Sequence, residues 1–132
     1  MPGSWDAEIE LLRLAETGTR FTAAVIGNGK PFDVLANVEI GRDLMGVVSK
    51  HELFLTLLNL SDDSKLVLPV KFSDPLTPAR NNTPLNTEIR LTINNWKANE
   101  GDILKAIATY KVTAGVHTNV STAESSHAVV TD

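Results

Sequence analysis

Strict alternation of apolar and polar residues is the feature that most constrains the fold of this chain. In DILKAIATYKVTAG (residues 102–115), one parity is wholly apolar or aromatic from residue 104 to residue 114, and the other is mostly Lys and Thr. Side chains of a β-strand point alternately to its two faces, so this pattern predicts a strand with one face in the core. A helix over residues 103–110 would leave Val112 and Ala114 unexplained. The apolar face comprises Leu104, Ala106, Ala108, Tyr110, Val112 and Ala114.

A second alternating run, PFDVLANVEI (residues 31–40), predicts a half-buried strand whose polar face carries Asp33, Asn37 and Glu39. Upstream, TRFTAAVI (residues 19–26) is rich in β-branched and aromatic residues. The intervening GNGK supplies the glycines that a tight turn demands. These three segments together predict a β-hairpin.

Two segments are ambiguous between helix and strand. In SKHELFLTLLNL (residues 49–60), Ser49 and Glu52 have the spacing of a helical capping box, yet Leu residues alternate as in a strand buried on both faces. The SDDS turn (residues 61–64) separates this run from KLVLPV, so we interpret residues 52–60 as a central strand. WDAEIELLRLAE (residues 5–16) favours a strand by the alternation of Trp5, Ala7, Ile9 and Leu11, and a short helix remains the alternative for both segments.

Further segments complete the predicted fold. NTEIRLTINNW (residues 86–96) predicts a strand that ends or bulges near Asn95, and residues 118–132 predict a fraying edge strand. SDPLTPARNNTPLNT (residues 73–87) contains Pro75, Pro78 and Pro84 and predicts a long loop.

Seven or eight short strands with regular turn signals predict an all-β, antiparallel two-sheet sandwich, with residues 1–132 as one domain. The general pattern resembles immunoglobulin-like and fibronectin-type modules. The Cys–Trp–Cys signature of immunoglobulins is absent, so we name no family.

Composition excludes several classes of function. A net charge of −4 and scattered basic residues argue against nucleic-acid binding. The chain has no cysteine, which excludes disulfides, thiolate nucleophiles and cysteine-based zinc sites. No apolar run reaches the roughly 18 residues of a membrane span, and MPGSWDAEIE is not a classical signal peptide. We expect a soluble, acidic protein, and the compartment stays open.

No catalytic, cofactor or metal motif stands out, so we expect no enzyme activity and no bound cofactor. The carboxylates of residues 6–10 are typical of a solvated strand face, and the oxygen-rich turns at residues 61–64 and 99–102 supply too few ligands for calcium. The three histidines are too dispersed for a metal signature, and no G-x-S-x-G elbow positions a serine near His127. These carboxylates, turn residues, histidines and serines are Asp6, Glu8, Glu10, Ser61, Asp62, Asp63, Ser64, Asn99, Glu100, Asp102, His51, His117, His127, Ser121, Ser125 and Ser126.

Two places are candidate binding surfaces. Trp96 follows Asn94 and Asn95 at the end of a predicted strand, where an exposed ring would suit a sugar or protein contact; the alternative is a ring folded over one end of the sandwich. The proline-braced loop offers Arg80, Asn81 and Asn82, unless it simply crosses between the sheets.

The predicted function is a non-catalytic recognition or assembly module that binds a protein partner or itself. A carbohydrate-binding module is the alternative. A hydrolase whose residues converge only in three dimensions is a third possibility.

Overall fold

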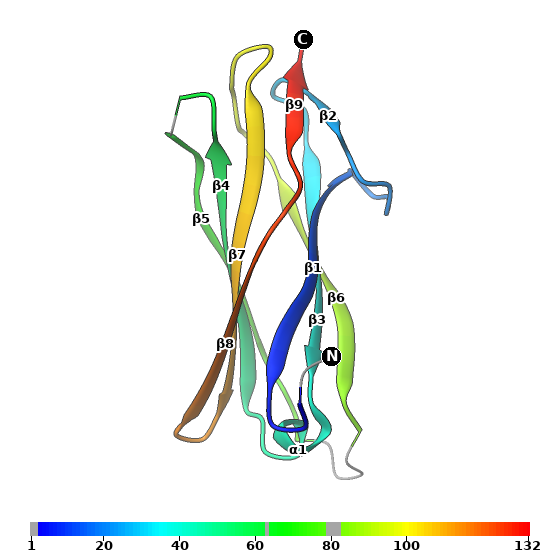
Figure 1. The fold of residues 1–132 in the computed structure, drawn as a ribbon, viewed down its shortest axis with the longest axis vertical. Coiled ribbons are helices and arrows are strands. Elements are labelled where there is room, and N and C mark those ends of the chain that lie inside the picture. The colour runs from blue at the N-terminus through cyan, green and yellow to red at the C-terminus, as the bar shows by residue number, and fades with distance from the viewer. Residues whose placement is uncertain (1–2, 63, 79–82) are drawn as a thin grey trace.

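The computed structural model describes residues 3–62, 64–78 and 83–132, with side chains described outside residues 64–69. Within these ranges, nine strands and one short helix form two stacked sheets (Figure 1). The elements are β1 (Ala7–Glu16), β2 (Val25–Gly27), β3 (Phe32–Ile40), α1 (Arg42–Met45), β4 (Lys50–Asn59), β5 (Ser64–Pro75), β6 (Leu85–Ile93), β7 (Ile103–Ala114), β8 (His117–Glu124) and β9 (Ala128–Thr131). No helix in the described residues is long enough to span a bilayer.

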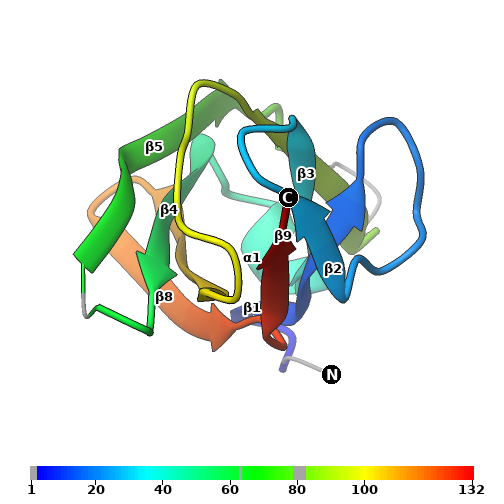
Figure 2. The ribbon, with the colours of Figure 1, turned by 90° about the horizontal axis from the view of Figure 1, so that it is seen from above.

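One sheet has the strand order β1-β3-β6, and the other has the order β2-β9-β7-β4-β5 with β8 beside β7. The view from above shows the two sheets packed face to face (Figure 2). All described pairs are antiparallel except β2 with β9. The predicted all-β two-sheet sandwich is therefore confirmed.

The described strands number nine, more than the seven or eight that we expected. Part of the excess comes from the C-terminal tail, which forms two strands instead of one. Strand β8 pairs with Ile107–Ala114, and β9 pairs with Ile103 and Leu104 farther along the same strand. Between them, Ser125 lies beside Ala106 of β7, where its backbone N–H donates to Ala106 O and its Oγ accepts from Ala106 N–H.

The core lies between the sheets and is built on β4 and β7, which run side by side. The apolar parity of β7 predicted from the sequence is buried throughout. Strand β4 is the central strand that we predicted, between β5 and β7. Its Leu53, Leu55 and Leu57 are buried, whereas Phe54 is exposed, so the expected burial of both faces is wrong.

The capping-box spacing at Ser49 marks no helix. The Ser49 N–H and Oγ both donate to the carbonyl of Thr113, at 2.8 and 3.0 Å, and extend the pairing of β4 with β7.

The predicted hairpin of residues 19–26 with 31–40 is wrong. The GNGK segment does form a tight turn, with Lys30 N–H donating to Gly27 O and Gly29 at a φ of +75°. However, the turn connects strands of different sheets: β2 pairs with β9, and β3 pairs with β1 and β6. Local turn chemistry requires a reversal of the chain and leaves the choice of partner to tertiary packing.

Strand β3 is buried on both faces, not half-buried as predicted. Asp33 on its polar parity is covered by the loop after β1, and its carboxylate accepts hydrogen bonds from Gly18 N–H, Thr92 Oγ1 and Arg90. Burial raises the pKa of this carboxyl, but these donors together outweigh burial and hold the pKa below its ordinary value.

Strand β1 is a strand, as favoured, but its alternation is broken. A β-bulge between Ile9 and Leu11 shifts the register against β3. Ile9, Leu12 and Leu14 consequently face the core, and Leu11 is exposed. Trp5 precedes the strand and is also exposed, which corrects its predicted place beside Ala7 and Ile9.

Candidate functional site

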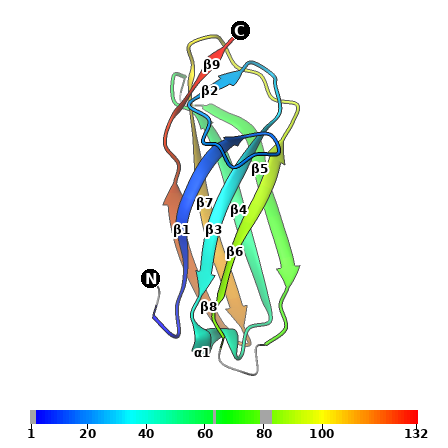
Figure 3. The same ribbon diagram turned by 90° about the vertical axis from the view of Figure 1, so that its right-hand side faces the viewer.

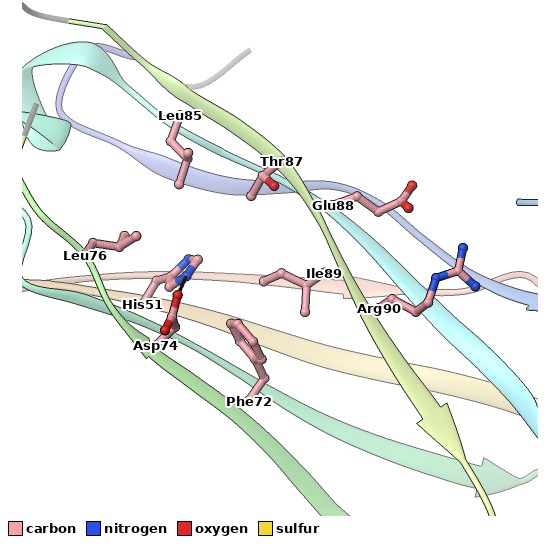
Figure 4. Close-up of a pocket in the computed structure, with 9 residues that line it drawn as sticks. All are labelled: His51, Phe72, Asp74, Leu76, Leu85, Thr87, Glu88, Ile89 and Arg90. Atoms are coloured by element: carbon pink, nitrogen blue, oxygen red, sulfur yellow. Dashed lines mark ion pairs between the residues drawn. The ribbon is translucent and has the colours of Figure 1, made fainter. Parts of the chain in front are cut away.

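The sandwich is closed along one side and open along the other. On the closed side, β1 approaches β8, and Ile9 N–H donates to Ser121 Oγ at 3.2 Å. On the opposite side, the edge strands β5 and β6 lie side by side (Figure 3). Side chains of these two strands line a cleft of about 330 Å³. The residues that line this β5–β6 cleft are His51, Phe72, Asp74, Leu76, Leu85, Thr87, Glu88, Ile89 and Arg90 (Figure 4).

Both walls of the cleft alternate in the same way. On the β5 side, Phe72, Asp74 and Leu76 share one parity, and Leu76 keeps that register because its N–H donates to Ser49 O at 2.9 Å. On the β6 side, Leu85, Thr87 and Ile89 share one parity. Each wall therefore presents an apolar, a polar and an apolar side chain at a spacing of two residues.

The floor of the cleft is His51 of β4, which is buried. Its Nδ1 lies 2.7 Å from the hydroxyl of Tyr110, and its ring meets Phe72 edge-to-face at 5.5 Å. Burial raises the pKa of Tyr110, so the hydroxyl keeps its proton, and the tautomer of His51 sets which of the two groups donates. The other ring nitrogen, Nε2, faces Asp74.

Burial lowers the pKa of His51 below its ordinary value, and the carboxylate of Asp74 offsets part of this effect. His51 is accordingly neutral at pH 7. Its Nε2 lies 3.9 Å from Asp74 Oδ2, which is beyond hydrogen-bonding distance.

Asp74 stands at the mouth of the cleft, and its side chain is 56% exposed. The other two charged residues of the lining point away from His51 (Figure 4). Glu88 lies 3.8 Å from Arg13 and 3.7 Å from Arg20, and Arg90 pairs with the buried Asp33 and donates to Thr19 O. Asp74 has no cationic partner of this kind among the described residues.

The two strands that border the cleft differ as edges. Strand β6 pairs with β3 over nine consecutive residues without a register shift. Strand β5 is interrupted by two register shifts against β4 and contains Pro69 and Pro75, which lack an N–H donor. Regular unpaired backbone is a template for an added strand, so β6 is the better edge for one.

Trp96 is buried, with 4% of its surface exposed. Its Nε1 donates to Lys30 O at 2.7 Å, and its ring meets Phe32 edge-to-face at 5.5 Å. Of the two positions that the sequence left open for this ring, the exposed one is wrong, and the ring folded over one end is what the structure shows. The strand ends at Ile93, as the broken parity indicated, and Asn95 has a φ of 55°.

The remaining predicted binding residues do not meet at one site in the described part of the chain. Asn94 and Asn95 are exposed just beyond Ile93, at the opposite end of β6 from Leu85. Arg80, Asn81 and Asn82 lie outside the described residues. The loop itself is shorter than predicted, because β5 continues to Pro75 and β6 begins at Leu85.

Carboxylates gather beside β1 and β3. Glu8 pairs in register with Glu39, and a hydrogen bond with Glu10, together with burial, raises the pKa of Glu39. The described residues contain no group of three or more His, Asp or Glu that could hold a metal ion.

Sequence reasoning missed the β5–β6 cleft. In the sequence, His51 is one of three scattered histidines, and Asp74 lies in the segment predicted to be a loop. Neither residue carries a local signal, because their proximity arises from the pairing of β4 with β5 in the folded sheet.

Comparison with protein-family models gives no match, and neither does comparison with curated proteins. Among solved structures, the chain is similar to the crystal structure of the CARDB domain of the PF1109 protein from Pyrococcus furiosus, which was solved in complex with di-metal ions. The TM-score is 0.47 at 17% sequence identity, and the match covers 96% of this chain and 94% of that one. We therefore derive a function from this chain's own residues.

Proposed function

We propose that this chain is a non-catalytic recognition module that binds an extended segment of a protein as an additional strand on β6. The observation that carries the proposal is the β5–β6 cleft, with its apolar contacts, lying directly beside a regular strand edge that pairs with no other strand among the described residues. An added strand would pair its backbone with β6 and place alternate side chains over the cleft.

The half-buried apolar residues of the cleft supply the attraction. Phe72, Leu76 and Leu85 pack against the core but remain partly exposed, so a bound side chain would remove further apolar surface from water. Ordering an extended segment costs conformational entropy, which offsets part of the free energy gained by burying this surface. Because the interface is also small, we expect an affinity of about micromolar.

Two further expectations stay within this proposal. The loop that carries Arg80, Asn81 and Asn82 leaves the cleft at Leu76 and returns at Leu85, so we propose these three residues as additional contacts. A second copy of the chain is one possible donor of the added strand. The carbohydrate-binding alternative required an exposed ring at Trp96, and the buried ring gives it no support.

A display library of random, linear ten-residue segments tests the proposal. We expect the protein to enrich segments in which apolar residues alternate, because only every second side chain of a strand faces the cleft. An L76E/L85E variant places carboxylates in both walls and should lose this enrichment. An R80A/N81A/N82A variant tests the adjoining loop in the same selection.

Val116 provides the matched control, because it is 96% exposed in the turn between β7 and β8, away from the cleft. A V116E variant should enrich the same segments as the wild type. Thermal unfolding of each variant checks that it is folded. If L76E/L85E is folded and retains the enrichment, the binding site lies elsewhere.

A further inference from the structure

We infer that the segment bound at the β5–β6 cleft carries a lysine or arginine between two apolar residues, in the pattern apolar–x–basic–x–apolar, and that Asp74 receives the basic side chain. This inference rests on the proposed function and adds the chemistry of the partner.

The order of side chains on β5 sets the pattern. Phe72, Asp74 and Leu76 lie on one face of the strand, two residues apart, so the carboxylate is flanked by apolar contacts on both sides. The β6 wall repeats this order with Leu85, Thr87 and Ile89. A strand laid over the cleft meets the same spacing, because its own side chains also alternate with a period of two.

Charge complementarity selects a cation for the central position. Glu88 and Arg90 already have partners of opposite charge outside the cleft, which leaves Asp74 as the lining's available charge among the described residues. Its neighbour His51 is turned to Tyr110 by the 2.7 Å hydrogen bond and approaches Asp74 no closer than 3.9 Å.

Apolar surroundings strengthen the expected pair. Asp74 lies between Phe72 and Leu76 on the β5 wall (Figure 4), where a bound segment would exclude water from one side of its carboxylate. Lysine and arginine suit this position because their long aliphatic stems can cross apolar surface before the charge meets the carboxylate.

The experiment compares segments selected on the wild type with those selected on an Asp74→Asn variant, which keeps the shape of the side chain and removes its charge. We expect wild-type selection to enrich a basic residue at the central position, and D74N selection to enrich only the apolar alternation. A Glu100→Gln variant removes one exposed negative charge far from the cleft and should retain the basic preference.

Synthetic peptides then measure the effect. A selected peptide and its counterpart with norleucine at the basic position should differ about tenfold in Kd on the wild type, as expected for a half-exposed, charge-assisted contact. The two peptides should bind D74N equally well, and the difference on the wild type should shrink as salt is added.

The outcomes separate this inference from the function beneath it. Enrichment of alternating apolar segments with no central basic residue overturns the Asp74 contact and leaves strand recognition standing. An equal tenfold difference on D74N also overturns the contact. If the wild type enriches no segments, or if the L76E/L85E variant enriches the same ones, both proposals are overturned.

Discussion

At the scale of single residues, His51 belongs both to the buried core and to the candidate site. It is buried on the floor of the cleft, hydrogen-bonded to Tyr110 and faced by Asp74. The fold favours the neutral imidazole, because protonation would place a charge among Phe72, Tyr110 and the core with only a half-exposed carboxylate nearby.

We predict that stability falls as the pH drops from 7 to about 5.5. The pKa of His51 is lowered in the folded protein, so the unfolded chain, with a histidine pKa of about 6.5, binds more protons in this range. Its contribution is therefore complete above pH 6.5 and is lost as the pH falls toward the folded value.

Urea unfolding at several pH values measures this dependence. A His51→Gln variant should show a flatter curve between pH 7 and 5.5. An Asp74→Asn variant should show a steeper one, because the carboxylate that offsets burial is gone. A wild-type curve that rises toward pH 5.5 would contradict the prediction.

At the scale of elements, β4 shows how one strand separates core from surface. Because β5 and β7 pair with its two edges, the exposure of its side chains depends only on which face of the sheet they lie on. Leu55 is 1% exposed against the other sheet, and Phe54 is 37% exposed on the outer face, where Lys71 lies 5.6 Å from its ring.

We predict that Leu55→Ala destabilises the protein by about 3 kcal/mol, because it leaves a cavity between the sheets. Phe54→Ala should cost about 1 kcal/mol or less, because its ring is already partly in water. Urea denaturation of the two variants compares adjacent residues on one strand. Equal costs would contradict the assignment of the two faces.

At the scale of the whole molecule, the sandwich is asymmetric. One end is closed by Trp96 over Phe32, with Asn28 and Ala98 bonded to each other across the same end. One side is closed by β1 against β8, and the β5–β6 side remains open. This asymmetry places the candidate site on a side of the sandwich and not on the loops at its ends.

The whole molecule also brings the two oxygen-rich turns together. Asn59 Nδ2 donates to Asp102 Oδ2 at 2.7 Å, Asn99 N–H donates to the same oxygen at 2.9 Å, and Ile103 N–H donates to Ser61 Oγ at 3.1 Å. These oxygens already accept hydrogen bonds from protein N–H groups. The bonds hold the two turns together without a metal ion.

We therefore expect no metal ion in these turns and predict that EDTA changes Tm by less than about 1 °C. If an ion were bound, its removal would lower the stability of the folded protein by mass action. Differential scanning fluorimetry with and without EDTA measures the change. A drop of several degrees that millimolar calcium reverses would show that these turns bind the ion.

The sequence by itself determined the fold class, the faces of β7 and the central place of β4. Alternation with a period of two is a local property: it records which side chains must leave water, whatever strand lies alongside. The same locality explains why the chain reversal at GNGK and the strand end near Asn95 were predicted.

Only the tertiary structure decided which strands pair and where a site forms. The bulge in β1 moved Leu11 outward, the loop after β1 buried Asp33, and Trp96 turned inward to donate to Lys30 O. The β5–β6 cleft forms where the edge strand of a three-stranded sheet faces the edge strand of a six-stranded one. His51 and Asp74 are 23 positions apart in sequence and meet only through the register of β4 with β5, which no local pattern specifies.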